Sequence, residues 1–150
     1  MTENIHYDNT STDIDKFSLH DSRAVFASFE NEKLIFCFED GIYYADYSDD
    51  WPNTGKAEVE FTIDLARGIT IYQFMESNKQ TIRKEIDLKL LIDKINSREW
   101  ELEFLYRYDG YREMLYKCWI WENEGPQTFE CELWISTKAD TVFRWDDPVD

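Results

Sequence analysis

The stretch from Arg23 to Tyr47 constrains the fold most, because apolar and polar residues alternate along it between two turn sequences. Asp40-Gly41 is a strong hairpin signal, since glycine adopts positive φ at no steric cost, and Asn31-Glu32 is a weaker one. A two-residue turn at Asn31-Glu32 would pair Phe29 with Leu34 and gather apolar side chains on one face. The sequence therefore predicts a three-stranded antiparallel meander, with these residues at the centre of its apolar face: Val25, Phe29, Phe36, Phe38 and Tyr43.

The rest of the chain predicts a β-rich domain of antiparallel meanders. Strands are expected over 56–64, 69–76, 81–86, 100–108, 111–121, 128–136 and 141–145, and one short helix near 88–97, with Asp87 as its N-cap. With a two-residue turn at Asp109-Gly110, the apolar residues of the two strands of this hairpin would lie on opposite faces. A loop with an odd number of residues brings them onto the same face, which predicts a three-residue loop with a bulge at Gly110. We expect a mainly β (α+β) fold of about nine strands in a two-layer or barrel-like arrangement.

Length and composition predict a single domain. The chain has 150 residues, 43% of them hydrophobic and 17% aromatic, which is enough for a substantial core. Residues 1–16 are polar and predict a flexible N-terminal arm, residues 17–146 the β-rich domain, and residues 147–150 a solvated tail. Cys37, Cys118 and Cys131 fall in predicted strands without metal-site spacing, so we expect reduced thiols in a cytoplasmic protein and no cofactor. No apolar run is long enough for a membrane span.

The net charge limits the partners that the chain can bind. Thirty-two acidic residues against 16 basic ones give a formal charge of −16. This charge excludes nucleic acid and anionic membranes as favoured partners, whereas a basic protein would be attracted and steered. The same charge is also explained by solubility alone.

Two groups of residues are candidates for partner binding. Asp46, Asp49 and Asp50 cluster beside Trp51 in a predicted loop, and their spacing matches no calcium loop, so no metal is predicted. The second group lies on the more polar sides of later strands, where aromatic and charged residues together form a plausible protein-binding surface: Trp119, Trp121 and Trp134.

His20 and Asp21 form the one acid–base pair that is adjacent in sequence. In an extended strand these two side chains would point to opposite faces, so adjacency does not make a catalytic dyad. We expect them to brace the entry to the first strand, with catalysis as the weaker alternative.

The segment Phe17-Ser-Leu-His-Asp-Ser22, followed by the meander, resembles the start of several families of small uncharacterised bacterial proteins. Some of these resemble immunity proteins encoded beside polymorphic toxins. The resemblance covers about the first 45 residues and implies a small cytoplasmic protein that neutralises a toxin by binding it. With the net charge, we expect an acidic protein-binding module whose toxin partner is basic. Two alternatives remain: a ligand-binding or hydrolytic β-barrel with an aromatic pocket, and a structural subunit of a homo-oligomer.

Overall fold

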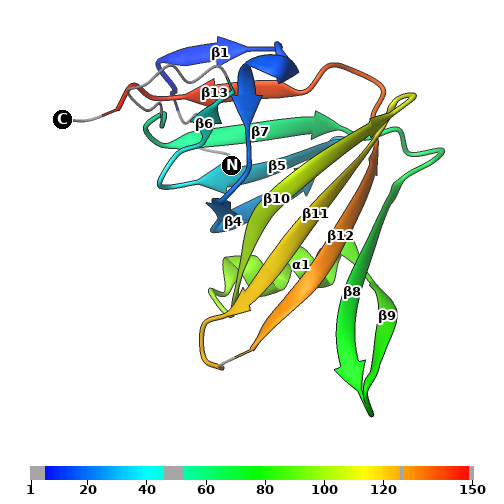
Figure 1. Cartoon of the computed structure of the whole chain (residues 1–150). Coiled ribbons are helices and arrows are strands. Elements are labelled where there is room, and N and C mark those ends of the chain that lie inside the picture. Colours follow the sequence, from blue (N-terminus) through cyan, green and yellow to red (C-terminus); the bar gives the residue numbers. More distant parts are fainter. Residues whose placement is uncertain (1–5, 46–52, 126, 149–150) are drawn as a thin grey trace.

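Two antiparallel sheets form the layers of the fold, and their strands run in clearly different directions in Figure 1. The structure is a computed structural model that describes residues 6–45, 53–125 and 127–148. The five-stranded sheet has the order β1 (Asn9–Ser11), β13 (Val142–Trp145), β7 (Ala57–Thr62), β5 (Lys33–Phe38) and β4 (Phe26–Glu30). The six-stranded sheet has the order β3 (Ser22–Ala24), β10 (Trp100–Gly110), β11 (Glu113–Glu122), β12 (Thr128–Ser136), β8 (Ile69–Ser77) and β9 (Gln80–Ile86).

The predicted fold class is confirmed: the described residues form antiparallel sheets in two layers, with one short α-helix. They contain thirteen strands rather than about nine, and the sheets do not close into a barrel. The additional strands are short pieces that carry no alternation long enough to be read from the sequence.

One hydrophobic core joins the two sheets. Phe104 of β10 lies edge-on to Phe36 and Phe38 of β5, with ring centroids 5.3 and 5.6 Å apart, and Tyr116 of β11 packs on the same ring at 5.2 Å. These four side chains are almost fully buried. Edge-to-face aromatic pairs stabilise a core beyond the area that they bury.

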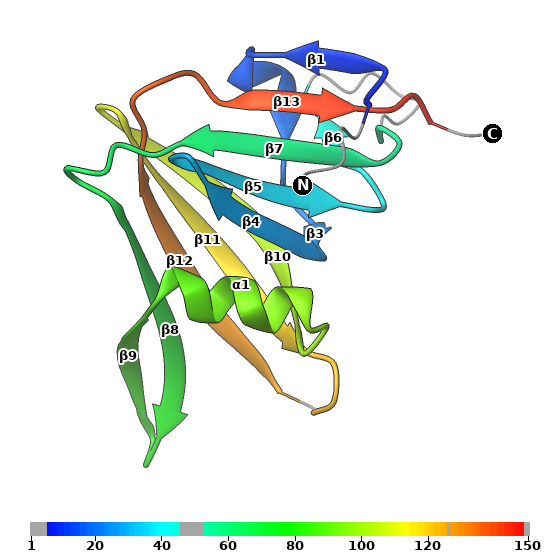
Figure 2. The ribbon, with the colours of Figure 1, turned by 180° about the vertical axis from the view of Figure 1, so that it is seen from behind.

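Helix α1 (Leu88–Asn96) lies at the end of the core, in contact with β4, β10 and β8 (Figure 2). Leu91 and Ile95 are its buried residues, one turn apart on one face. Asp87 occupies the N-cap position as expected, although its side chain makes no capping hydrogen bond. At the other end, the Asn96 amide accepts a hydrogen bond from Ala27 N and donates one to Ala27 O, each 2.9 Å long, at the edge of β4.

The meander prediction is right for its first turn and wrong for its second. Phe29 pairs with Leu34 across Asn31-Glu32, and both turn residues adopt positive φ. The chain changes sheets at Val25, however, between β3 and β4, and Phe29 is 40% exposed because β4 is an edge strand.

The third predicted strand of the meander does not pair with β5. Residues Tyr43–Tyr44 (β6) pair instead with Phe17–Ser18 (β2), and β7 takes the place beside β5. The reason lies at Gly41, where φ is +81° and a Cβ would meet the Thr54 carbonyl oxygen at 2.2 Å. The chain is held there against Thr54, whose hydroxyl oxygen accepts a hydrogen bond from Ile42 N.

The predicted N-terminal arm is partly built into the fold. β1 pairs with β13, and residues Ile14–Lys16 form a 3-10 turn. Tyr7 is buried, and burial raises the pKa of its hydroxyl well above the ordinary value, with the negative charge of Glu58 adding to the effect. Residues 9–11 and 14–16 of the predicted arm thus have regular backbone structure, which needs few apolar side chains.

Candidate functional site: the His20 turn and the outer sheet face

The His20 turn connects β2 to β3 and is held against β10. Ser22 N donates to Leu19 O at 2.9 Å, and Asp21 lies in the left-handed region with φ of 63°. Asp21 N in turn donates to Phe104 O at 2.8 Å. Residues 19–22, the His20 turn, thus form a β-turn at the edge of the six-stranded sheet.

A β-bulge in β10 explains why this turn sits where it does. The register shifts between Phe104 and Tyr106, so Leu105 is the extra residue on its strand. Bulges leave one residue outside the ladder and often lie near functional sites. The His20 ring nitrogen Nδ1 donates to Leu105 O at 2.7 Å, and the ring packs on Tyr106 with centroids 5.2 Å apart.

The expectation that His20 and Asp21 point apart is wrong. His20 Nε2 lies 3.4 Å from Asp21 Oδ2, because the two residues occupy a turn rather than an extended strand. Both side chains are substantially exposed. Among the described residues, the partners of the imidazole are the Leu105 carbonyl and the Asp21 carboxylate, and no hydroxyl or thiol is hydrogen-bonded to it.

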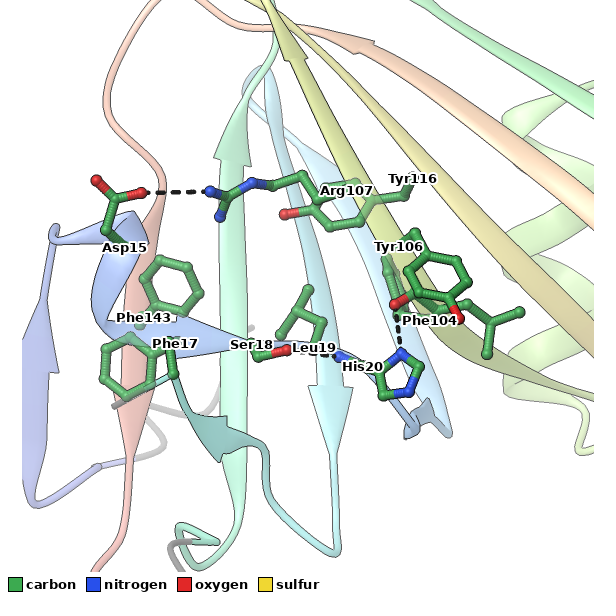
Figure 3. A pocket seen from close by; sticks show the side chains of 12 residues that line it. Asp15, Phe17, Ser18, Leu19, His20, Phe104, Tyr106, Arg107, Tyr116 and Phe143 are labelled. Carbon is green, nitrogen blue, oxygen red and sulfur yellow. Dashed lines mark hydrogen bonds and ion pairs between the residues drawn. The ribbon is translucent and has the colours of Figure 1, made fainter. Parts of the chain in front are cut away.

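A pocket of about 210 Å³ lies beside the turn (Figure 3). Asp15 and Arg107 both line this pocket and pair with each other. The Arg107 guanidinium donates to Ile14 O and Asp15 Oδ1, at 3.2 and 3.3 Å, and lies 3.1 Å from Asp109 Oδ1. Burial raises the pKa of the Tyr116 hydroxyl well above its usual value, so this phenol stays neutral. These partners brace the pocket and leave little polar capacity for a ligand.

The larger hollow lies on the outer face of the six-stranded sheet, which is the face turned away from the core. Leu102, Cys118 and Leu133 point into the core, so the alternate residues of the same strands point outward. Among the described residues no helix or strand covers this face, which is turned toward the viewer in Figure 1, while α1 lies behind it. The outer face contains these aromatic and charged residues: Arg23, Tyr72, Phe74, Arg83, Glu103, Lys117, Trp119, Trp121, Glu130, Glu132 and Trp134.

The strand register arranges part of this face as one row across all six strands. Arg23 lies opposite Glu103, Glu103 opposite Trp119, Trp119 opposite Glu130, Glu130 opposite Phe74, and Phe74 opposite Arg83. Directly opposed side chains have Cβ atoms roughly 4.5–5.5 Å apart and interact. A groove of about 480 Å³ follows the middle of this row, lined by Glu103, Trp119, Glu130 and Phe74 and bordered by the His20 turn.

The three tryptophans predicted to bind a partner all lie on the outer face, in different states. The indole nitrogen of Trp121 donates to Glu103 Oε1 at 2.9 Å, and that of Trp134 donates to Glu132 Oε1 at 3.1 Å. The indole N–H of Trp119 has no hydrogen-bond partner in the described part of the chain. Trp119 is thus the tryptophan that remains available at the centre of the groove.

Asp46, Asp49, Asp50 and Trp51 lie outside the described residues. Within residues 6–45, 53–125 and 127–148, no three His, Cys, Asp or Glu side chains gather closely enough to hold a metal ion.

Sequence reasoning missed Phe74, Glu103 and Glu130 as parts of the site. The outward phase of Glu103 and Glu130 could be read from the alternation of their strands. Their position beside Trp119 could not, because it depends on which strands are neighbours in the sheet.

Comparisons with known proteins give no relative for this chain. No protein-family model matches it, and neither the curated proteins nor the solved structures include a significant match. In the described part of the chain, no helix has the length and apolar character needed to cross a bilayer.

Proposed function

We propose that the protein is an acidic protein-binding module of the immunity type, which neutralises a basic toxin in the cytoplasm by holding it on the outer face. The observation that carries the proposal is the groove around Trp119, where aromatic rings and carboxylates lie together without cover from the described residues. Aromatic residues in desolvated, central positions supply most of the energy in protein interfaces.

Charge supports the same partner. A formal charge of −16 speeds the encounter with a basic protein and repels acidic ones. The resemblance of residues 17–22 to immunity-like families supports a toxin as the partner. At physiological salt, the attraction between exposed charges on the two proteins is screened over a Debye length of about 8 Å. Because this attraction speeds the encounter, the association rate should fall at least about tenfold from low to physiological salt.

The test combines capture with rescue of growth. The tagged protein captures its partner from the source cell, and the partner is identified and expressed alone. We expect a basic protein that stops growth, and co-expression of the present chain should restore it. A harmless partner, or binding that does not depend on salt, would contradict the proposal.

Two variants locate the interface. Trp119→Ala removes the central ring and should abolish the rescue. Tyr111→Ala removes an aromatic residue at the tip of the β10–β11 hairpin, where it is 81% exposed, and should rescue as well as the wild type. Rescue by Trp119→Ala would show that the outer face is not the interface.

A second candidate function, self-association, is favoured by β9. This strand ends the six-stranded sheet, and six of its seven residues are exposed. Unpaired strand edges recruit other strands. Light scattering over a wide concentration range tests it, and a monomer at every concentration would exclude it.

A further inference from the structure

The outer face itself shows how an arginine is accommodated beside its aromatic rings. The Arg23 guanidinium lies over the Trp121 ring at 4.4 Å and also approaches Glu103 and Glu101, at 3.3 and 3.7 Å. The Arg83 guanidinium lies over the Tyr72 ring at 4.2 Å. A guanidinium that stacks on an aromatic ring and pairs with a carboxylate combines two favourable interactions.

Trp119 has the same surroundings but no cation from its own chain. It lies between Glu103 and Glu130 in the row, and in the described part of the chain no arginine or lysine lies over its ring. The segments outside the description contain neither Arg nor Lys, so the chain has no other basic residue to supply.

Glu130 also lacks a partner. Glu103 is engaged by Arg23 and Trp121, and Glu132 by Lys117 and Trp134. Glu130 is exposed, and no ion pair or hydrogen bond joins its carboxylate to another described residue. A half-buried ring with a free indole N–H and an unpaired carboxylate opposite it therefore meet in one groove.

We propose that Trp119 and Glu130 form a docking site for an arginine side chain of the protein partner. The guanidinium stacks on the Trp119 ring and donates two hydrogen bonds to the Glu130 carboxylate, as Arg23 combines Trp121 with Glu103. Lysine fits less well, because an ammonium is a point charge that neither stacks nor donates in a planar fork. The inference rests on the proposed function, since it names the group by which the partner is recognised.

The experiment uses a hexa-arginine peptide as the probe, with hexa-lysine and hexa-citrulline as matched peptides. Citrulline has the shape of arginine without the charge. The indole N–H resonances of the full chain are followed by NMR, and the Trp119 signal is assigned with Trp119→Phe. We expect hexa-arginine to shift the Trp119 signal and hexa-citrulline to leave it unchanged. Hexa-lysine should bind the protein several-fold more weakly than hexa-arginine, as measured by titration of the same signal. Equal shifts with hexa-arginine and hexa-lysine, or any comparable shift with hexa-citrulline, would overturn the proposal.

A charge-matched pair of variants separates a site from general attraction. Glu130→Gln and Glu30→Gln each remove one negative charge, and Glu30 is an exposed residue of β4 on the other sheet. We expect Glu130→Gln to weaken hexa-arginine binding about tenfold and Glu30→Gln less than twofold, because a hydrogen-bonded charge contributes more than a distant one. Equal effects would show that only the overall charge attracts the peptide.

A further variant supplies the arginine from within the chain. In Glu130→Arg the new side chain can lie over Trp119 as Arg23 lies over Trp121, so peptide binding at Trp119 should be lost while circular dichroism stays unchanged. Undiminished binding would overturn the inference. If Trp119→Ala abolishes growth rescue but these peptide tests fail, only the arginine site is refuted. If Trp119→Ala still rescues growth, the proposed interface is refuted.

Discussion

The contact between His20 and the β10 bulge makes a quantitative prediction for His20→Ala. The substitution removes the hydrogen bond to Leu105 O and the packing on Tyr106. A net hydrogen bond contributes about 0.5–1.5 kcal/mol, and an aromatic pair contributes a similar amount. Since 44% of the His20 side chain is exposed, the lower part of the sum applies, about 1–2 kcal/mol. For a domain of this size the melting temperature should fall by about 3–6 °C.

Thermal and urea denaturation measure this loss, and His20→Asn separates its two parts. The asparagine Nδ2 occupies nearly the position of the imidazole Nδ1, so this variant keeps the donor to Leu105 O but loses the ring. We expect it to recover about half of the lost stability. If His20→Ala is as stable as the wild type, the bracing role is refuted, and a residue kept for chemistry at no benefit to stability becomes the better explanation.

Three further predictions concern other parts of the molecule. Burial, with the nearby Glu58 charge, raises the pKa of the Cys37 thiol to about 11 from 9.0. Between these two pH values the folded state keeps a proton that the unfolded chain releases. The thiol's contribution to the free energy of unfolding is therefore fully present below pH 9 and is lost as the pH rises through about 11. Cys37→Ala should flatten this part of the urea-midpoint profile, and a profile parallel to the wild type would contradict the assignment. Arg144→Leu should cost about 2–3 kcal/mol in urea denaturation, because it leaves the nearly buried Glu58 without its ion pair and Glu60 with Lys33 alone, 3.7 Å away; an unchanged midpoint would refute this. Gly68→Ala should cost about 1 kcal/mol of stability, because its φ is positive, and Gly41→Ala should cost several times more, because it also meets a close backbone atom. Equal melting temperatures of the two variants would show that the clash at Gly41 is relieved.

Local sequence patterns predicted the helix and the pairing of strands that are close neighbours in the sequence. The β4–β5 register follows from the turn at Asn31-Glu32, and the helix follows from apolar residues at helical spacing. In β10 the parity change was predicted correctly, but it comes from the bulge at Leu105 and not from a loop at Gly110. Hence Leu102 and Phe104 face the core as predicted, whereas Tyr106 is 56% exposed. A bulge anywhere before the turn satisfies the same alternation, so the sequence alone could not locate it.

Long-range pairing was beyond the sequence patterns. Nothing near Tyr43 indicates that it pairs with Ser18, because that choice depends on β7 filling the place beside β5. The candidate site shows the same division. The outward phase of Trp119 could be predicted, but its neighbours Glu103 and Glu130 follow from the strand order.

The two hydrogen bonds from Asn96 to Ala27 have a consequence for aggregation. β4 is an exposed edge of its sheet, where an incoming chain would seek a free N–H and C=O to begin a ladder. The amide of Asn96 occupies both groups at Ala27, the second residue of the strand, and acts as a substitute neighbour only one residue long. A side chain 69 positions away in the sequence therefore protects this edge against intermolecular β-pairing, in addition to the charged Glu30 at the end of the strand.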